Sequence, residues 1–166
     1  MSPSPTLHRV LVGIQTEIDP RLATHKKVAK ALYRITDVHG ISAVYHFFDE
    51  EEEGLTVVYS LRTQTEPLEL KKKIKEVQKT IKSPGLSIQI LVFDDVVLRA
   101  VDVVLPSMEL HRLKRWCVPA ADLWGDYVHP IEGKDLKMLS ETTGSLEKIE
   151  FYAQSKTLLD FLSRET

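Results

Sequence analysis

The chain has 166 residues, 43% hydrophobic and 28% charged, with a formal net charge of -2 at pH 7. This length fits one domain with a substantial core, and the near balance of charges gives no reason to expect nucleic acid or an anionic membrane as a partner. No apolar run approaches the ~20 residues that span a bilayer.

The single cysteine, Cys117, cannot form an internal disulfide, which is typical of a reducing cytosol. The first residues lack the basic and apolar segments of a secretory signal, so we expect a cytoplasmic protein. Cys117 is either a reactive thiol or, as is commoner between Trp116 and Val118, a small core residue. Trp116 and Trp124 are either interface anchors or side chains buried against a sheet.

Residues 1–7 are expected to form a disordered tail, followed by elements in the order strand, helix, strand, strand, helix, strand. Gly13 is expected to end the first strand, and Asp19 to cap the first helix. The six elements are predicted at residues 9–14, 19–36, 41–48, 55–61, 67–82 and 86–93. This order predicts an α+β, ferredoxin-like fold, in which two helices cover one face of an antiparallel sheet.

The remainder of the chain is less regular. An extended piece, a helical region and a short helical turn are predicted at residues 96–105, 110–123 and 133–141. We assign residues 8–143 to the α+β domain and 144–166 to an extra C-terminal helix of the same domain, whose apolar residues recur at helical spacing over 145–164. That apolar stripe either packs on the domain or forms the seam of a homodimer.

Local motifs give little chemistry. Lys71–Lys73 lies on the polar side of a predicted helix, and Asp49–Glu53 is a run of acids without ordered metal-ligand spacing. A solvated helix face and a soluble turn are the favoured interpretations. No metal-binding or phosphate-cradling motif occurs, and none of the six histidines has a partner that indicates catalysis.

Longer stretches of the chain resemble one enzyme family. Segments 42–45, 67–70, 86–97 and 105–134 match its Ser-x-x-Tyr, helix-start, metal-strand and Pro-His to His-Pro-x-x-Gly-Lys patterns. The matches in the last segment are Leu105, Pro106, His111, Val118, Pro119, Ala121, Asp122, Leu123, His129, Pro130, Gly133 and Lys134. The chain is thereby similar to the 6-hydroxymethyl-7,8-dihydropterin pyrophosphokinase (HPPK) family of folate biosynthesis.

The resemblance implies transfer of a pyrophosphoryl group from ATP to a pterin hydroxymethyl oxygen, with magnesium neutralising the phosphates. The family's two metal-binding aspartates fall on Ser87 and Gln89, which are poor ligands for a hard dication. Its pterin-binding asparagine and its stacking phenylalanine fall on Thr56 and Arg115. Its histidine beside Pro106 becomes Ser107, and the loop before the metal strand is reduced to residues 83–85.

We therefore expect a family member that has lost the aspartate pair and pyrophosphoryl transfer, with no catalytic residue, no metal and no cofactor. It would bind a pterin-like ligand or a protein partner. The candidate ligand-pocket residues are Tyr45, Phe47, Phe48, Thr56, Ile90, Ser107 and His111, although Phe47 and Phe48 also suit ordinary packing.

The alternative is a divergent pyrophosphokinase that still uses magnesium and ATP. It would rely on relocated carboxylates from Asp94, Asp95 and Asp102. Its candidate phosphate-binding cations are Arg112, Lys114 and Arg115, although a solvated helix face is the commoner interpretation of that cluster.

Overall fold

The computed structural model describes residues 7–163, and every structural statement below concerns that part of the chain. The predicted tail, residues 1–7, lies outside it except for Leu7. The strands are β1 His8–Thr16, β2 Asp37–Ile41, β3 Val44–Phe48, β4 Glu53–Thr63, β5 Leu86–Phe93, β6 Leu98–Arg99, β7 Val104–Leu105 and β8 Lys148–Ala153. The helices are α1 Arg21–Ile35, α2 Pro67–Ile81, α3 Lys114–Trp124, α4 Leu136–Thr142 and α5 Asp160–Ser163, with a 3-10 turn at Ser155–Leu159 before α5.

The main sheet has the order β5-β1-β4-β3-β8, with β2 also paired to β4, and every pairing is antiparallel. β6 and β7 form a separate small hairpin. Because adjacent residues of a strand point to opposite faces, β1 and β4 supply apolar side chains to both sides of the sheet. The fold is α+β, as the order of elements predicts.

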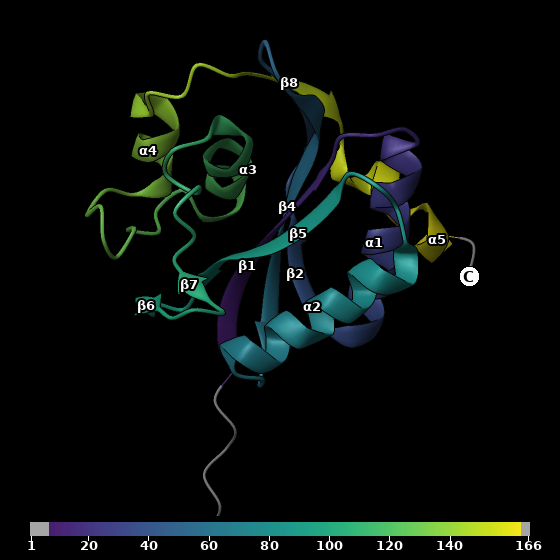
Figure 1. The fold of residues 1–166 in the computed structure, drawn as a ribbon, viewed down its shortest axis with the longest axis horizontal. Helices are drawn as coiled ribbons and strands as arrows, with labels where there is room; N and C mark the ends of the chain where they lie inside the picture. The colour runs from purple at the N-terminus through teal and green to yellow at the C-terminus, as the bar shows by residue number, and fades with distance from the viewer. Residues whose placement is uncertain (1–6, 164–166) are drawn as a thin grey trace, which may run out of the picture.

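Helices cover both faces of the sheet (Figure 1). On one face, α1 and α2 pack Val28, Leu32 and Leu70 against the even-numbered residues of β1. On the other face, α3 and α4 pack Trp116 and Leu136 against Leu11, Val58 and Leu91. The two helices predicted for one face are α1 and α2, while α3 and α4 form a second layer that the ferredoxin-like order alone does not specify.

The last part of the chain corrects the sequence prediction of a helix over 145–164. Residues 148–153 form the edge strand β8, paired with β3, and only short helical turns follow it. The apolar spacing of this segment fits the period of a strand as well as that of a helix, since Ile149, Phe151 and Ala153 occupy alternate positions. Pairing with the open edge of β3 decides between them, and Arg164 lies outside the described residues.

Smaller corrections concern the predicted ends of elements. Gly13 does not end β1 but lies within it, where a side chain would meet the Trp116 ring at 2.5 Å. The predicted strand 41–48 is divided between β2 and β3. Asp19 makes no capping hydrogen bond, because the residue before α1 is Pro20, and the Asp19 carboxylate faces Arg21 at 3.8 Å.

The alternatives for three buried side chains are decided by the packing. Trp116 is fully buried, Trp124 is 9% exposed, and both belong to the core between the sheet and α3, not to an exposed surface. Cys117 is buried between them along α3, and burial raises the pKa of its thiol to about 12. A thiol that stays protonated at neutral pH is a packing residue, not a nucleophile.

Candidate functional site

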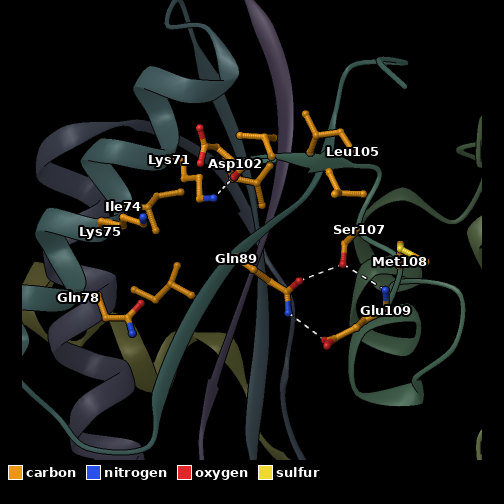
Figure 2. Close-up of a pocket in the computed structure, with 14 residues that line it drawn as sticks. Lys71, Ile74, Lys75, Gln78, Gln89, Asp102, Leu105, Ser107, Met108 and Glu109 are labelled. Atoms are coloured by element: carbon orange, nitrogen blue, oxygen red, sulfur yellow. Dashed lines mark hydrogen bonds between the residues drawn. The ribbon is translucent and has the colours of Figure 1, made fainter. Parts of the chain in front are cut away.

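A cleft of about 400 Å³ opens at the β5 edge of the sheet, between α2 and the segment that leads from β7 toward α3 (Figure 2). Isoleucines from α2 and β5 supply its apolar lining, among them Ile74 and Ile90. Polar side chains enter from both sides, with lysines on α2 and Gln89, Ser107 and Glu109 opposite. The cleft can therefore hold an apolar body with polar groups at its margin.

The polar side of the cleft is a closed hydrogen-bond network (Figure 2). Ser107 Oγ donates to Gln89 Oε1 at 2.9 Å, and Gln89 Nε2 donates to Glu109 Oε2 at 3.1 Å. The Glu109 amide donates back to Ser107 Oγ at 3.2 Å, and the Trp116 indole donates to the same carboxylate at 3.1 Å. The network fixes the Gln89 amide in place, because its oxygen and its nitrogen each have a hydrogen-bond partner in the protein.

The α2 side of the cleft is positively charged. Lys71 and Lys75 lie one turn apart on the helix, and Lys71 Nζ donates to the carbonyl of Asp102 (Figure 2). Asp102 belongs to the connection between β6 and β7, so this contact ties α2 to the small hairpin. Lys75 is a cation in the cleft opposite Glu109.

A second cluster, on the α3 face of the sheet, centres on Arg115 at the start of α3. Arg115 is only 5% exposed, and its Nε donates to the buried Glu147 carboxylate at 2.9 Å. Its Nη2 donates to Glu52 at 2.7 Å and its Nη1 to Gln15 at 3.3 Å. The guanidinium lies 4.1 Å from the centre of the Phe47 ring. We refer to these five residues as the Arg115 cluster.

The charge at the centre of this cluster is balanced within the protein. Burial disfavours the charged guanidinium, but the hydrogen bonds and charges of Glu52 and Glu147 outweigh that cost, so the pKa of Arg115 lies above its ordinary value. Thr56, fully buried on β4, donates its hydroxyl to the Arg115 carbonyl at 3.0 Å. The Arg115 cluster is thus a packed, self-satisfied unit, and Arg115 is not a free phosphate-binding cation.

The structure separates the predicted pocket residues into several environments. Ile90 and Ser107 line the cleft, whereas Phe47 and Thr56 lie at the Arg115 cluster. Phe48 points to the opposite face of β3 and stacks on His46, with ring centres 5.0 Å apart. Phe47 and Phe48 therefore do not enclose a common pocket. Phe47 is a fully buried packing residue, whereas Phe48 is half-buried and borders a separate hollow with Leu146 and Lys148.

The remaining candidates lie apart from the cleft. Tyr45 donates its hydroxyl to Asp122 on α3; burial, then the Asp122 carboxylate, raises the pKa of Tyr45. His111 pairs with Glu132 at 3.0 Å and packs edge-on against His129. Arg112 is exposed and Lys114 half-buried, and neither lines the cleft.

The relocated carboxylates of the enzyme alternative are dispersed. Asp94 accepts hydrogen bonds from His8 and from the Arg9 amide, both at 2.7 Å, at the far end of β5. Asp95 is exposed beside it, and of the three aspartates only Asp102 borders the cleft. They do not converge on one metal position.

Magnesium, which the resemblance implies, can be tested against the donors at the corresponding positions. Ser87 and Gln89 share one face of β5 and offer only a hydroxyl and an amide. The nearby Glu109 carboxylate already accepts hydrogen bonds from Gln89 and Trp116. Within residues 7–163 no group of three or more His, Cys, Asp or Glu side chains could hold a metal ion. The donor set does not fit a phosphate-bound dication.

Sequence reasoning missed three important residues. Glu109 carried a signal, because it follows Ser107 by two positions in the stretch that resembles the family. Gln15 directly follows the predicted first strand, and nothing in the sequence links it to Arg115. Glu147 carried no signal, since it lay in a segment predicted to be a helix.

Comparisons with known proteins agree with this fold. A pyrophosphokinase from Aquifex aeolicus, 2-amino-4-hydroxy-6-hydroxymethyldihydropteridine pyrophosphokinase, is 26% identical over 140 residues, covering 77% of this chain and 88% of that protein. The wild-type Plasmodium falciparum HPPK-DHPS structure with pteroate superposes with a TM-score of 0.73 at 10% identity, and an HPPK-DHPS complex with substrates gives 0.72 at 8%. No known family profile matches the chain.

The fold is therefore the α+β fold of HPPK domains. The chain is thus similar in sequence to a hydroxymethyldihydropterin pyrophosphokinase and has the fold of HPPK domains. The superposition covers 85% of this chain but only 43% of the wild-type Plasmodium chain, which is much longer. Among residues 7–163 there is no helix with the length and apolarity needed to traverse a bilayer.

Proposed function

We propose that this chain is a cytoplasmic protein of the pyrophosphokinase fold that no longer transfers pyrophosphate and instead binds a small ligand or a protein partner. The observation that carries the proposal is the Gln89–Ser107–Glu109 network. It includes Gln89, one of the two positions on which the resemblance places metal-binding aspartates, and it bonds that amide to Ser107 and Glu109. Phosphoryl transfer depends mainly on neutralising phosphate charge, and the Ser87 hydroxyl and Gln89 amide are poor ligands for the magnesium that would do so.

The Arg115 cluster supports the same proposal from the pterin side. The resemblance places the pterin-binding asparagine and the stacking phenylalanine on Thr56 and Arg115. In this chain the Thr56 hydroxyl bonds to the Arg115 backbone, and the guanidinium rests on Phe47 between two carboxylates. An incoming pterin would have to displace a buried ion pair, which is costly. The cleft beside β5 remains open to a ligand.

The experiment is isothermal titration of the protein with a non-hydrolysable magnesium-ATP analogue and with hydroxymethyldihydropterin, each alone and both together. Binding of a single compound would indicate a retained pocket without transfer. An absence of heat with both would direct the search to protein partners. Micromolar binding of both, each tightening the other, would contradict the proposal.

A matched pair of variants assigns any binding to the cleft. Met108 lines the cleft and is 45% exposed, so Met108→Trp should narrow its opening without disturbing the core. Met138 on α4 is 48% exposed and does not line the cleft, so Met138→Trp is the control. Binding in the cleft is weakened by the first substitution and unchanged by the second.

The alternative function is a divergent hydroxymethyldihydropterin pyrophosphokinase, and the name of the Aquifex relative favours it. This version needs carboxylates at new positions, with Asp94 and Asp95 among the candidates. The double variant Asp94→Asn with Asp95→Asn tests it, because relocated metal ligands would make any measured ATP turnover depend on that pair. Turnover that survives the double substitution would exclude these ligands.

A further inference from the structure

The edge of the sheet formed by β8 is open. β8 is the last strand in the order β5-β1-β4-β3-β8 and, within residues 7–163, pairs only with β3 (Figure 1). Its outer backbone groups are therefore available to another strand. Edge strands of this kind pair with further chains unless the protein blocks them with prolines, bulges or charges.

Large apolar side chains gather along this edge. Leu146, just before β8, is 94% exposed, and Phe151 and Tyr152 within it are 60% and 52% exposed. No proline interrupts residues 145–154, and the one register shift of β8 against β3 falls between Phe151 and Ala153, which leaves 148–151 in regular pairing. The charges on the strand do not form a repulsive edge, since Lys148 is followed two residues later by Glu150. Exposed aromatic and aliphatic side chains on an unpaired strand are a signature of an interaction surface.

The sequence of β8 is complementary to itself in antiparallel pairing. Around a twofold axis through Ile149, that residue faces its own copy, and Lys148 faces Glu150 of the second copy twice. Leu146 faces Tyr152 of the second copy, again twice, so the exposed Leu146 side chain is covered. Oppositely charged and apolar residues directly across a strand pair are stabilising.

Other symmetric registers satisfy the strand less well. In a twofold strand pair, facing residues lie on the same side of the sheet, so the axis must pass through a residue position. An axis at Glu150 places two carboxylates opposite each other. An axis at Phe151 stacks two aromatic rings but places Leu146 opposite Lys156 and Lys148 opposite Gln154. Of these three registers, the Ile149 register is the one that pairs Lys148 with Glu150 and Leu146 with Tyr152, while it places Phe151 opposite Glu147.

We propose that this chain forms a twofold homodimer in which β8 pairs with β8 of a second copy in the Ile149 register, joining the two sheets. The occupant is a second copy because the charge and apolar matches repeat on both sides of the axis, as an isologous interface requires. The cleft at β5 lies on the opposite edge of the sheet and stays open in such a dimer. The inference does not depend on what the cleft binds.

A charge exchange tests both the surface and the register. Lys148→Glu places two carboxylates opposite each other, and Glu150→Lys places two ammonium groups opposite each other. Each variant alone should weaken dimerisation at least about tenfold. An equimolar mixture restores opposite charges at every facing position, so it should form a heterodimer. The measurement is sedimentation velocity of the full chain over a range of micromolar concentrations.

The controls separate association from folding. Lys156→Glu changes the same charge just beyond the strand and should leave the dimer unchanged, while thermal unfolding confirms that each variant folds. Glu150 also pairs with His46 at 3.0 Å, so Glu150→Lys can destabilise the fold itself. If that variant does not fold, the Lys148→Glu result decides the test. If the wild-type chain stays monomeric over a 100-fold range of concentration, the proposal is overturned. A wild-type dimer that both reversals leave intact overturns it too, because it would use another surface.

Discussion

The cleft and the Arg115 cluster use charge and space in different ways. In the cleft, short neutral side chains at positions 89 and 107 bond to each other and to Glu109, and a hollow of about 400 Å³ remains beside them. In the Arg115 cluster, a long cation fills the space and is neutralised by Glu52 and Glu147. The cleft therefore keeps an open volume beside a hydrogen-bond network, whereas the Arg115 cluster fills its space with a neutralised charge.

The difference has an energetic consequence. The cleft network is partly exposed, so its members can exchange protein partners for water at modest cost. The Arg115–Glu147 pair is buried, and neither charge can be left alone without a large penalty. A ligand therefore finds the cleft easier to enter, while the Arg115 cluster acts as a structural clamp between α3, β3 and the segment before β8.

The largest expected effect is at the buried pair. Arg115→Ala leaves the Glu147 carboxylate without its buried cation, so we expect the free energy of unfolding to fall by about 3–5 kcal/mol. Urea unfolding measures it. Arg112→Ala, exposed on the adjacent segment, is the control and should change stability by no more than ~0.5 kcal/mol. A loss below about 1 kcal/mol for Arg115→Ala would show that the cluster is not a clamp.

In contrast to Arg115, His25 is a buried ionisable group without a counter-charge. His25 is fully buried, and desolvation lowers its pKa to about 4, although its bond to the Leu55 carbonyl opposes this. The unfolded chain binds a proton near pH 6.5 and the folded chain does not until about pH 4, so stability falls as the pH drops through this window. The full difference is roughly 3 kcal/mol.

His25→Gln removes this titration and should flatten the dependence of unfolding free energy on pH between 6.5 and 5. Carboxylates such as Glu53, whose pKa is lowered by its bonds to His46 and Arg21, contribute mainly at lower pH. An unchanged slope in the variant would assign the acid sensitivity to other groups.

Trp116 joins the two regions, because it follows Arg115 in α3 and its indole bonds to Glu109 of the cleft. The tryptophan ring lies directly on Gly13 of β1. A Cβ at position 13 would meet the ring at 2.5 Å, so Gly13→Ala should cost about 1–3 kcal/mol through overpacking. Thermal unfolding gives the value. Pairing it with Trp116→Leu should recover part of the loss if the clash is the cause.

The smallest expected effect is a gain of metal binding. Ser87→Asp with Gln89→Asp places two carboxylates on the face of β5 that carries Gln89. We expect 10 mM magnesium to stabilise this double variant by about 1.4 kcal/mol, given a dissociation constant near 1 mM, while leaving the wild-type chain unchanged. Ser87→Asn with Gln89→Asn is the neutral control. Equal magnesium stabilisation of the wild type would mean that the cleft already holds a dication.

The sequence was informative where local periodicity and strand geometry decide the outcome. The period of two in residues 86–93 predicts that Ser87 and Gln89 share a face, and the apolar spacing of 67–82 predicts α2, so two of the elements that border the cleft follow from the sequence. The fold class followed from the order of these elements.

The Arg115 cluster could not be predicted, because its partners are distant in sequence and meet only through tertiary packing. The apolar residues around Glu147 fit a helical period as well as a strand period, and the sequence analysis predicts a helix there. Pairing with β3 decides for the strand and thereby brings Glu147 to Arg115. Without Glu147 beside it, the sequence predicts an Arg115 that is solvent-exposed or binds phosphate. The buried carboxylate instead makes Arg115 part of the packed core.

The central claim, that pyrophosphoryl transfer is lost, is tested most directly by the fate of ATP. The protein is incubated with magnesium, ATP and hydroxymethyldihydropterin, and AMP is measured by chromatography, with the Aquifex relative assayed alongside. We predict no AMP above the protein-free blank. AMP that accumulates in proportion to the pterin consumed would contradict the account and establish a working pyrophosphokinase.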